Sequence, residues 1–109
     1  RILEGDDWSG VQHSIAQSYL QLGDYRSAER EFLKLQYNFQ GSANWLASAH
    51  YGLADSYEAQ GKLDRAIQEL EKIQSKFGQT SEFGSHAGSR IRTLEAVTEM
   101  KSQRDPGRR

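Results

Sequence analysis

The sequence predicts an all-helical fold of two helix hairpins followed by a C-terminal capping helix. Three observations predict it. The chain matches itself when it is shifted by 38 residues, so that Ala16 falls on Ala54. Within each period, apolar residues recur at helical spacing. Each period also carries a glycine between two such stripes, at Gly23 and Gly61. Together these features predict stacked helix hairpins and no strand.

The internal match is dense and keeps its register over most of two periods. Conservative pairs such as Phe32 with Leu70 fill the positions between the identities. A fixed period of this size is typical of stacked supersecondary units. The identical residues are Ala16, Ser18, Tyr19, Gly23, Ala28, Glu31, Lys34, Gln36 and Phe39, which fall on Ala54, Ser56, Tyr57, Gly61, Ala66, Glu69, Lys72, Gln74 and Phe77.

The first hairpin is expected to consist of helices over about 10–22 and 25–39. Gly23 ends the first helix because glycine accepts the left-handed conformation found at helix ends. Asp24 can then cap the second helix with its side chain. The two apolar stripes are Val11, Ile15, Ala16, Tyr19 and Leu22, followed by Tyr25, Ala28, Phe32, Leu35 and Phe39.

The second hairpin repeats this plan with helices over about 44–60 and 63–77, separated by Gly61. A loop over 79–84 and a fifth helix over about 85–103 follow. Side chains expected to lie between the helices are Tyr19, Phe32, Leu53, Tyr57 and Leu70.

The fifth helix is expected to close the stack. It carries Arg92 and Glu95 where the preceding unit has Ala54 and Tyr57, and a repeat that turns polar is typical of a terminal cap. The predicted organisation is one domain over 1–103, with repeat one at about 9–40, repeat two at about 44–78, the cap at about 85–103 and a disordered tail over 104–109.

The N-terminal end leaves two interpretations open. Residues 1–9 could form an approach loop or the end of a helix that belongs to a further unit. Because the chain begins at Arg1 without Met or a signal peptide, it is expected to be a piece of a longer protein.

Composition excludes several classes of function. The formal net charge is −1, so no strong attraction to nucleic acid or to an anionic membrane is expected. The chain has no Cys, which removes disulfides, thiol catalysis and thiolate metal sites. No apolar run is long enough for a membrane span, so no direct membrane insertion is expected.

The two matching segments resemble tetratricopeptide repeats, from about residue 10 to 77, with a looser likeness to about 97. The resemblance implies a right-handed α-solenoid without catalytic activity. It also implies a protein or peptide partner, bound along the inner surface formed by the first helix of each unit. The residues that carry it are Ala16, Tyr19, Gly23, Ala28 and Phe32 in one unit and Ala54, Tyr57, Gly61, Ala66 and Leu70 in the other.

The sequence departs from the usual pattern of the family in two ways, and in both it resembles a bacterial subgroup of that family. The period is longer than the family norm, and the Pro that usually follows the second helix is replaced by Gln40 and Gly78. The subgroup includes the C-terminal domain of the Tol-Pal coordinator and an outer-membrane assembly lipoprotein. The resemblance therefore implies a larger bacterial assembly and a periplasmic or envelope-associated location.

A partner-binding strip is predicted on the first helices, opposite their apolar stripes. Tyr51 is an amphipathic side chain of the type enriched in binding hot spots. Asp55 and Glu58 make the second half of the strip acidic and favour a basic partner. A simple solvated helix face is the alternative. The strip comprises His13, Gln17, Leu20 and Gln21 on the first unit and Tyr51, Asp55 and Glu58 on the second.

Other constellations do not support a catalytic, metal or cofactor site. His13, His50 and His86 are far apart in sequence and lack carboxylates at ligand spacing. The Gly61-Lys62 pair joins two helices and lacks the rest of a phosphate-binding loop. Residues 84–88 put His where a nucleophile elbow needs Ser. Trp8 and Trp45 are expected to pack at helix starts.

The sequence therefore predicts a non-catalytic scaffold for protein–protein interaction that needs no cofactor. The alternative is a self-assembly module, a homo-oligomer formed through open repeat ends, because uncapped solenoids expose apolar surface.

Overall fold

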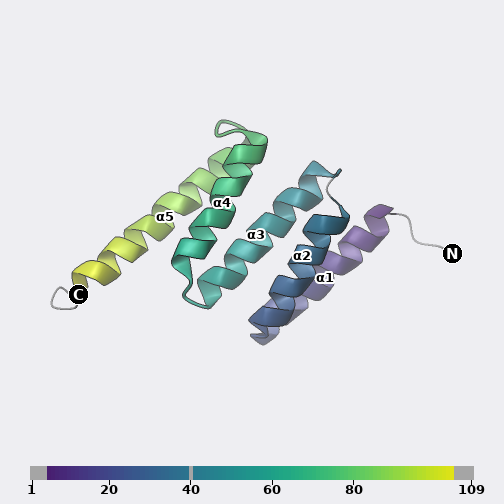
Figure 1. Cartoon of the computed structure of the whole chain (residues 1–109), viewed down its shortest axis with the longest axis horizontal. Helices are drawn as coiled ribbons and strands as arrows, with labels where there is room; N and C mark the ends of the chain where they lie inside the picture. The colour runs from purple at the N-terminus through teal and green to yellow at the C-terminus, as the bar shows by residue number, and fades with distance from the viewer. Residues whose placement is uncertain (1–4, 40, 105–109) are drawn as a thin grey trace.

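The computed structural model describes residues 5–39 and 41–104, and these residues form five helices and no strand. The all-helical prediction is confirmed. Each helix packs against the next one along the chain, and α1 also contacts α3. Figure 1 shows the helices side by side in chain order, from purple to yellow. The helices are α1 (Gly5–Leu22), α2 (Tyr25–Asn38), α3 (Ala43–Ala59), α4 (Leu63–Phe77) and α5 (Glu82–Arg104).

The turns inside the two hairpins form as the sequence predicts. Gly23 and Gly61 have φ values of 81° and 78°, the left-handed region that favours glycine. The side chain of Asp24 accepts a hydrogen bond from the backbone N–H of Ser27 at 3.2 Å and so caps α2. The equivalent residue before α4, Lys62, provides no side-chain cap.

Two helix starts differ from the prediction. Helix α1 begins at Gly5, so residues 5–9 are the first turns of α1 itself, and neither an approach loop nor the end of a helix from a further unit. Residues 1–4 lie outside the described part. Helix α5 begins at Glu82 and not near 85, because the Ser81 hydroxyl accepts from the N–H of Gly84 at 3.0 Å. The predicted tail begins one residue too early, because α5 extends to Arg104, and residues 105–109 lie outside the described part.

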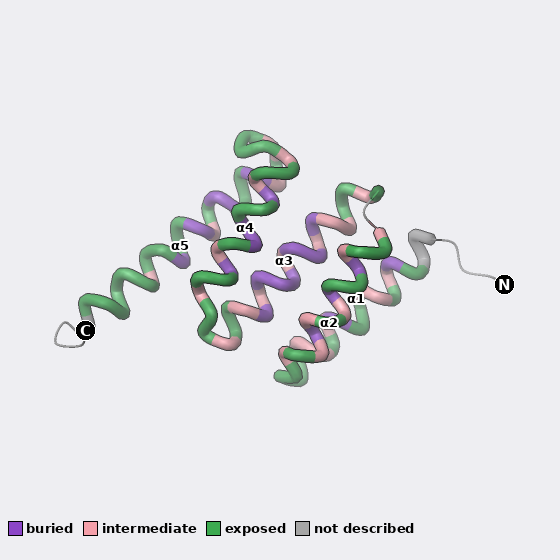
Figure 2. Tube along the Cα trace, viewed as in Figure 1, coloured by how far each residue is buried: buried purple, intermediate pink, exposed green. Residues whose placement is uncertain are grey.

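The core consists of two clusters, one formed by α1, α2 and α3 and the other by α3, α4 and α5. Phe32, Leu53 and Leu70 are fully buried, as predicted, whereas Tyr19 and Tyr57 are only partly buried and pack at the cluster edges. Figure 2 shows buried segments along the facing sides of the helices and an exposed C-terminal half of α5. The core therefore runs as a thin layer between successive helices, and both ends of the stack are open to solvent.

Gly52 allows α2 and α3 to approach closely. A Cβ atom at Gly52 would lie 2.2 Å from the Phe32 ring, well inside van der Waals contact. The sequence analysis did not single out this glycine. Its equivalents in the other units are Ser14 and Arg90, so the close approach is specific to this helix pair.

We expect Gly52→Ala to lower the free energy of unfolding by about 1–3 kcal/mol, the usual cost of overpacking a core. In an exposed helix interior the same change would stabilise by about 1 kcal/mol. Phe32→Leu, which copies Leu70 of the second hairpin, should suppress the effect when the two changes are combined. Urea unfolding of the two single variants and the double variant measures this coupling. An additive double variant would contradict the close contact.

Each hairpin carries the same polar bridge between its two helices. In the first, Gln12 donates to Glu31, and Lys34 lies 3.2 Å from the same carboxylate. In the second, Nδ1 of His50 lies 2.9 Å from a Glu69 oxygen. Because a carboxylate only accepts, this nitrogen carries the proton. Lys72 completes the bridge at 2.9 Å from the other oxygen.

Candidate protein-binding surface

The first half of the predicted strip is partly covered. The His13 ring packs against the rings of Phe32 and Trp45, with centroid distances of 6.1 and 5.6 Å. Burial lowers the pKa of His13, so this ring favours its neutral form. Leu20 packs against the core cluster, and Gln17 remains partly exposed. Only part of this half is therefore available to a partner.

The second half faces α5. The Tyr51 hydroxyl donates to the backbone carbonyl of Phe83 at 2.7 Å, and its ring lies 5.3 Å from the ring of His86. Burial raises the pKa of Tyr51, although the nearby Arg90 charge opposes this. Tyr51 thus links α3 to α5, and part of its contact area is used inside the chain.

Arg90 of α5 joins the two acidic residues of the strip. Its guanidinium lies 2.8 Å from Asp55 and 3.1 Å from Glu58. The pKa of Asp55 is raised by burial, against the opposing effect of Arg90. Both carboxylates keep part of their surface exposed. The three groups together carry a formal charge of −1 at neutral pH, so the acidic character is reduced but not lost.

The structure brings Tyr51, Asp55 and Glu58 together, and it adds His86 and Arg90, which the sequence analysis missed. The repeat register did not point to them. The 38-residue shift places Tyr51 and Asp55 on Ser89 and Thr93. His86 and Arg90 instead correspond to Ser48 and Gly52. Among the described residues, no hydrogen bond, ion pair or ring contact joins this cluster to His13 or Gln17. The strip is thus two separate surface regions.

The three histidines lie in different surroundings. His13 packs against Trp45, His50 pairs with Glu69 and His86 lies against Tyr51. Among the side chains that the structure describes, in residues 8–39 and 41–103, no group of three or more His, Asp or Glu could hold a metal ion.

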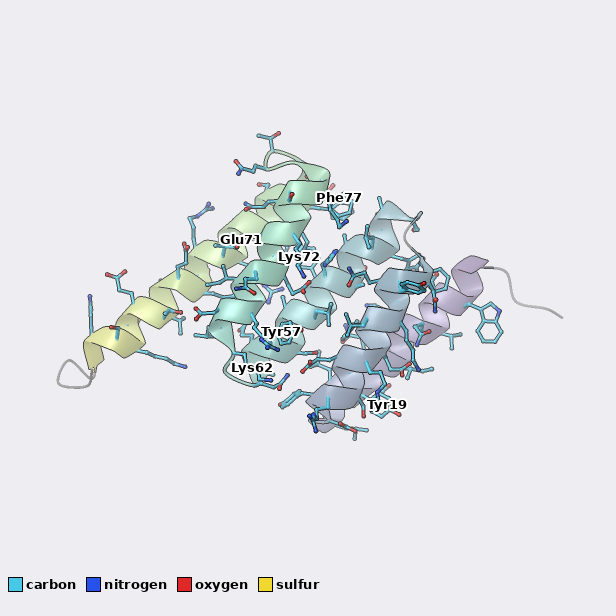
Figure 3. The ribbon with its side chains drawn as sticks, in the orientation of Figure 1. Tyr19, Tyr57, Lys62, Glu71, Lys72 and Phe77 are labelled. Carbon is cyan, nitrogen blue, oxygen red and sulfur yellow. The ribbon has the colours of Figure 1, made fainter. Side chains whose placement is uncertain are left out.

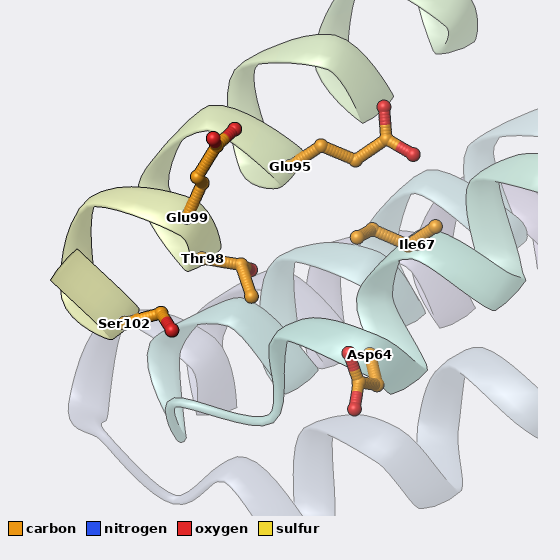
Figure 4. A pocket seen from close by; sticks show the side chains of 6 residues that line it. All are labelled: Asp64, Ile67, Glu95, Thr98, Glu99 and Ser102. Atoms are coloured by element: carbon orange, nitrogen blue, oxygen red, sulfur yellow. The ribbon is translucent and has the colours of Figure 1, made fainter. Parts of the chain in front are cut away.

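A hollow of about 450 Å³ lies between α4 and α5. At this place α5 has Glu95, whereas the equivalent residue of α3 is the aromatic Tyr57, which is labelled in Figure 3. The Tyr57 ring packs beside α4, under the Arg65 guanidinium. Figure 4 shows the hollow from close by. The lining residues are Asp64, Ile67, Glu95, Thr98, Glu99 and Ser102.

Comparison with known proteins decides the family. A family model described as tetratricopeptide repeat matches residues 9–37, and a second model with the same description matches residues 48–80. Together these matches cover more than half of the chain. The chain belongs to the tetratricopeptide repeat family. Searches of curated proteins and of solved structures gave no significant match.

The two matched segments agree with the helix hairpins of the structure. The first covers most of α1 and α2, and the second begins within α3 and ends just after α4. Tetratricopeptide repeats are generally protein–protein interaction modules and are typically non-catalytic. In the described part of the chain, no helix combines the length and the apolar character needed to cross a membrane.

Proposed function

We propose that this tetratricopeptide chain is an interaction scaffold that binds a partner segment on the face formed by its first helices. The supporting observation is the cluster formed by Tyr51, Asp55 and Glu58 of α3 with Arg90 of α5. In the 38-residue register, α3 and α5 both occupy the place of the first helix of a unit. It combines an aromatic ring with partly exposed charges, a mixture typical of binding surfaces. The net negative charge favours a partner segment that carries Lys or Arg.

On this proposal, Gln17 and the exposed part of His13 provide a second contact region on α1. Contacts between α1 and α3 place the two helices next to each other, which suits an extended segment that crosses both. We further propose that the chain is a single domain of two repeats and a cap. We also propose a role in a larger bacterial, envelope-associated assembly. Its support is the long period of the repeat and the absence of Pro after the second helix of each unit.

The test uses peptides selected from a random display library against the immobilised chain, because no partner is identified. Charge reversal by Glu58→Lys should weaken a selected peptide about tenfold, which corresponds to roughly 1.4 kcal/mol. The loss should shrink at high salt, because exposed charges are screened. Glu71→Lys on α4 is the matched control, since it makes the same charge change on an exposed second-helix residue.

Titration calorimetry at two salt concentrations measures both variants, and circular dichroism verifies that they stay folded. If Glu71→Lys weakens binding and Glu58→Lys does not, the peptides occupy the second-helix side and the proposal fails.

A further inference from the structure

Helix α1 carries an exposed apolar stripe. Trp8 is 53% exposed, Val11 41%, Ile15 42% and Leu22 80%. Their spacing of three, four and seven residues puts them on one side of the helix. Large apolar side chains that gather on one helix face usually mark a surface that another element covers.

The same positions in α3 are covered by α2. One period later the stripe corresponds to Leu46, Ala49, Leu53 and Gln60. Ala49 and Leu53 are fully buried in the cluster that contains Phe32. Leu46 is partly buried, and Gln60 donates a hydrogen bond to Glu29 of α2. The face of α3 that corresponds to the stripe is thus the face on which α2 packs.

The same positions in α5 are covered by α4. Two periods after the α1 stripe stand Gly84, Ala87, Ile91 and Thr98. The first three are buried, and Ala87 and Ile91 belong to the cluster that contains Leu70. Helices α3 and α5 therefore both use this face to pack against the second helix of the preceding hairpin.

We propose that the α1 stripe, Trp8, Val11, Ile15 and Leu22, is the docking face for the second helix of a further hairpin of the same repeat type. That helix lies on α1 as α2 lies on α3. The argument is the continuation of two observed interfaces, α2–α3 and α4–α5, by one period. The docking face is independent of the first-helix surface proposed above, so either can fail alone.

The contacts also limit the chemistry of the occupant. Phe32 fits against α3 because Gly52 has no Cβ, whereas the equivalent residue of α1 is Ser14. In the other interface, Arg90 stands at the Gly52 position and Leu70 at the Phe32 position. The occupant therefore presents a leucine-sized side chain there, in an amphipathic helix like α4.

A second copy of this chain offers no such helix. The apolar stripes of α2 and α4 are already covered, since Phe32 and Leu70 are fully buried. At the other end of the stack, α5 presents the exposed residues Arg92, Glu95 and Glu99, which do not complement an apolar face. Head-to-tail stacking of copies through these α5 residues, the self-assembly alternative, would therefore place charged side chains against the apolar stripe.

The test adds the proposed occupant to the full chain. A copy of residues 42–79, which contains the α4 helix, is inserted before residue 4, so that the 38-residue register is kept. Ile15→Glu is then introduced into both the parent and the extended chain. In the parent it should change Tm by no more than about 2 °C, because the site is exposed. In the extended chain it should lower Tm by about 5–10 °C, because the carboxylate would be buried without a partner.

Gln21→Glu is the matched control, because it adds the same charge to an exposed residue of α1 away from the stripe. It should have a small effect in both chains. Equal losses from Ile15→Glu in the parent and extended chains would overturn the proposal. Sedimentation of the parent over about a hundredfold range of concentration gives a second result. A dimer that Ile15→Glu abolishes would show that a second copy covers the stripe, and would also overturn it.

Discussion

Replacing Leu53 by alanine should lower the free energy of unfolding by about 2–5 kcal/mol, the usual cost of removing a large side chain from a packed core. Leu53 is fully buried between α2 and α3, in the cluster that also holds Phe32 and Leu35. A thin core has few other contacts to compensate for the cavity. The loss is a large share of the roughly 5–15 kcal/mol that stabilises a typical domain.

Leu22→Ala is the matched control for this change, because the same side chain is truncated at a position that is 80% exposed. It should shift stability by no more than about 0.5 kcal/mol. Urea unfolding followed by circular dichroism measures both variants. If Leu53→Ala were as mild as Leu22→Ala, the core between α2 and α3 would not be packed as described.

Glu69→Gln should destabilise the chain by about 1–3 kcal/mol at neutral pH, because it removes the charge that His50 and Lys72 bind. Burial alone would raise the pKa of Glu69. The hydrogen bonds from His50 and Lys72 outweigh burial and hold that pKa below its usual value of 4.5. A depressed carboxyl pKa contributes stability above the unfolded-state pKa, and this contribution is lost as the pH falls through the folded-state pKa.

The difference in stability between the parent and Glu69→Gln should therefore have its full size at pH 6–7. It should begin to shrink below about pH 4.5 and become small in stronger acid. Glu71→Gln is the control on the same helix. Figure 3 labels Glu71 next to Lys72, and Glu71 is exposed. It should change stability little at any pH. Thermal unfolding from pH 7 to 3 provides the comparison, and a constant difference across that range would rule out the linkage.

The helices could be predicted from sequence because their signals are local. The period, the apolar stripes and the turn glycines Gly23 and Gly61 define hairpins to within a few residues. The start of α5 was misplaced because Ser81 and Gly84 look like loop residues. In the structure, Gly84 lies in the first turn, where a Cβ would lie 1.8 Å from the Gly78 carbonyl oxygen. Such close approaches depend on how two helices meet, which periodicity does not describe.

The candidate surface was predictable only in part. The repeat register identified which helices form it, but it did not show that α5 would contact the acidic half. The hydrogen bond from Tyr51 ends on a backbone carbonyl, which has no signature in the sequence. The pairing of Arg90 with both Asp55 and Glu58 depends on the angle between α3 and α5. The partner-binding role of these residues remains a prediction.

The sequential packing has a consequence for how the chain loses structure. Contacts between helices join neighbours in the chain, with α1–α3 as a further pair, so unfolding can proceed one helix at a time from either end. Helix α3 contacts α1, α2 and α4 and hydrogen-bonds to α5, and opening it disrupts the whole stack. The C-terminal half of α5 has mostly exposed residues and can fray without disturbing the rest. The cooperativity of unfolding therefore depends on α3, which should be the last helix to unfold. Its formation should be required before the other helices can pack.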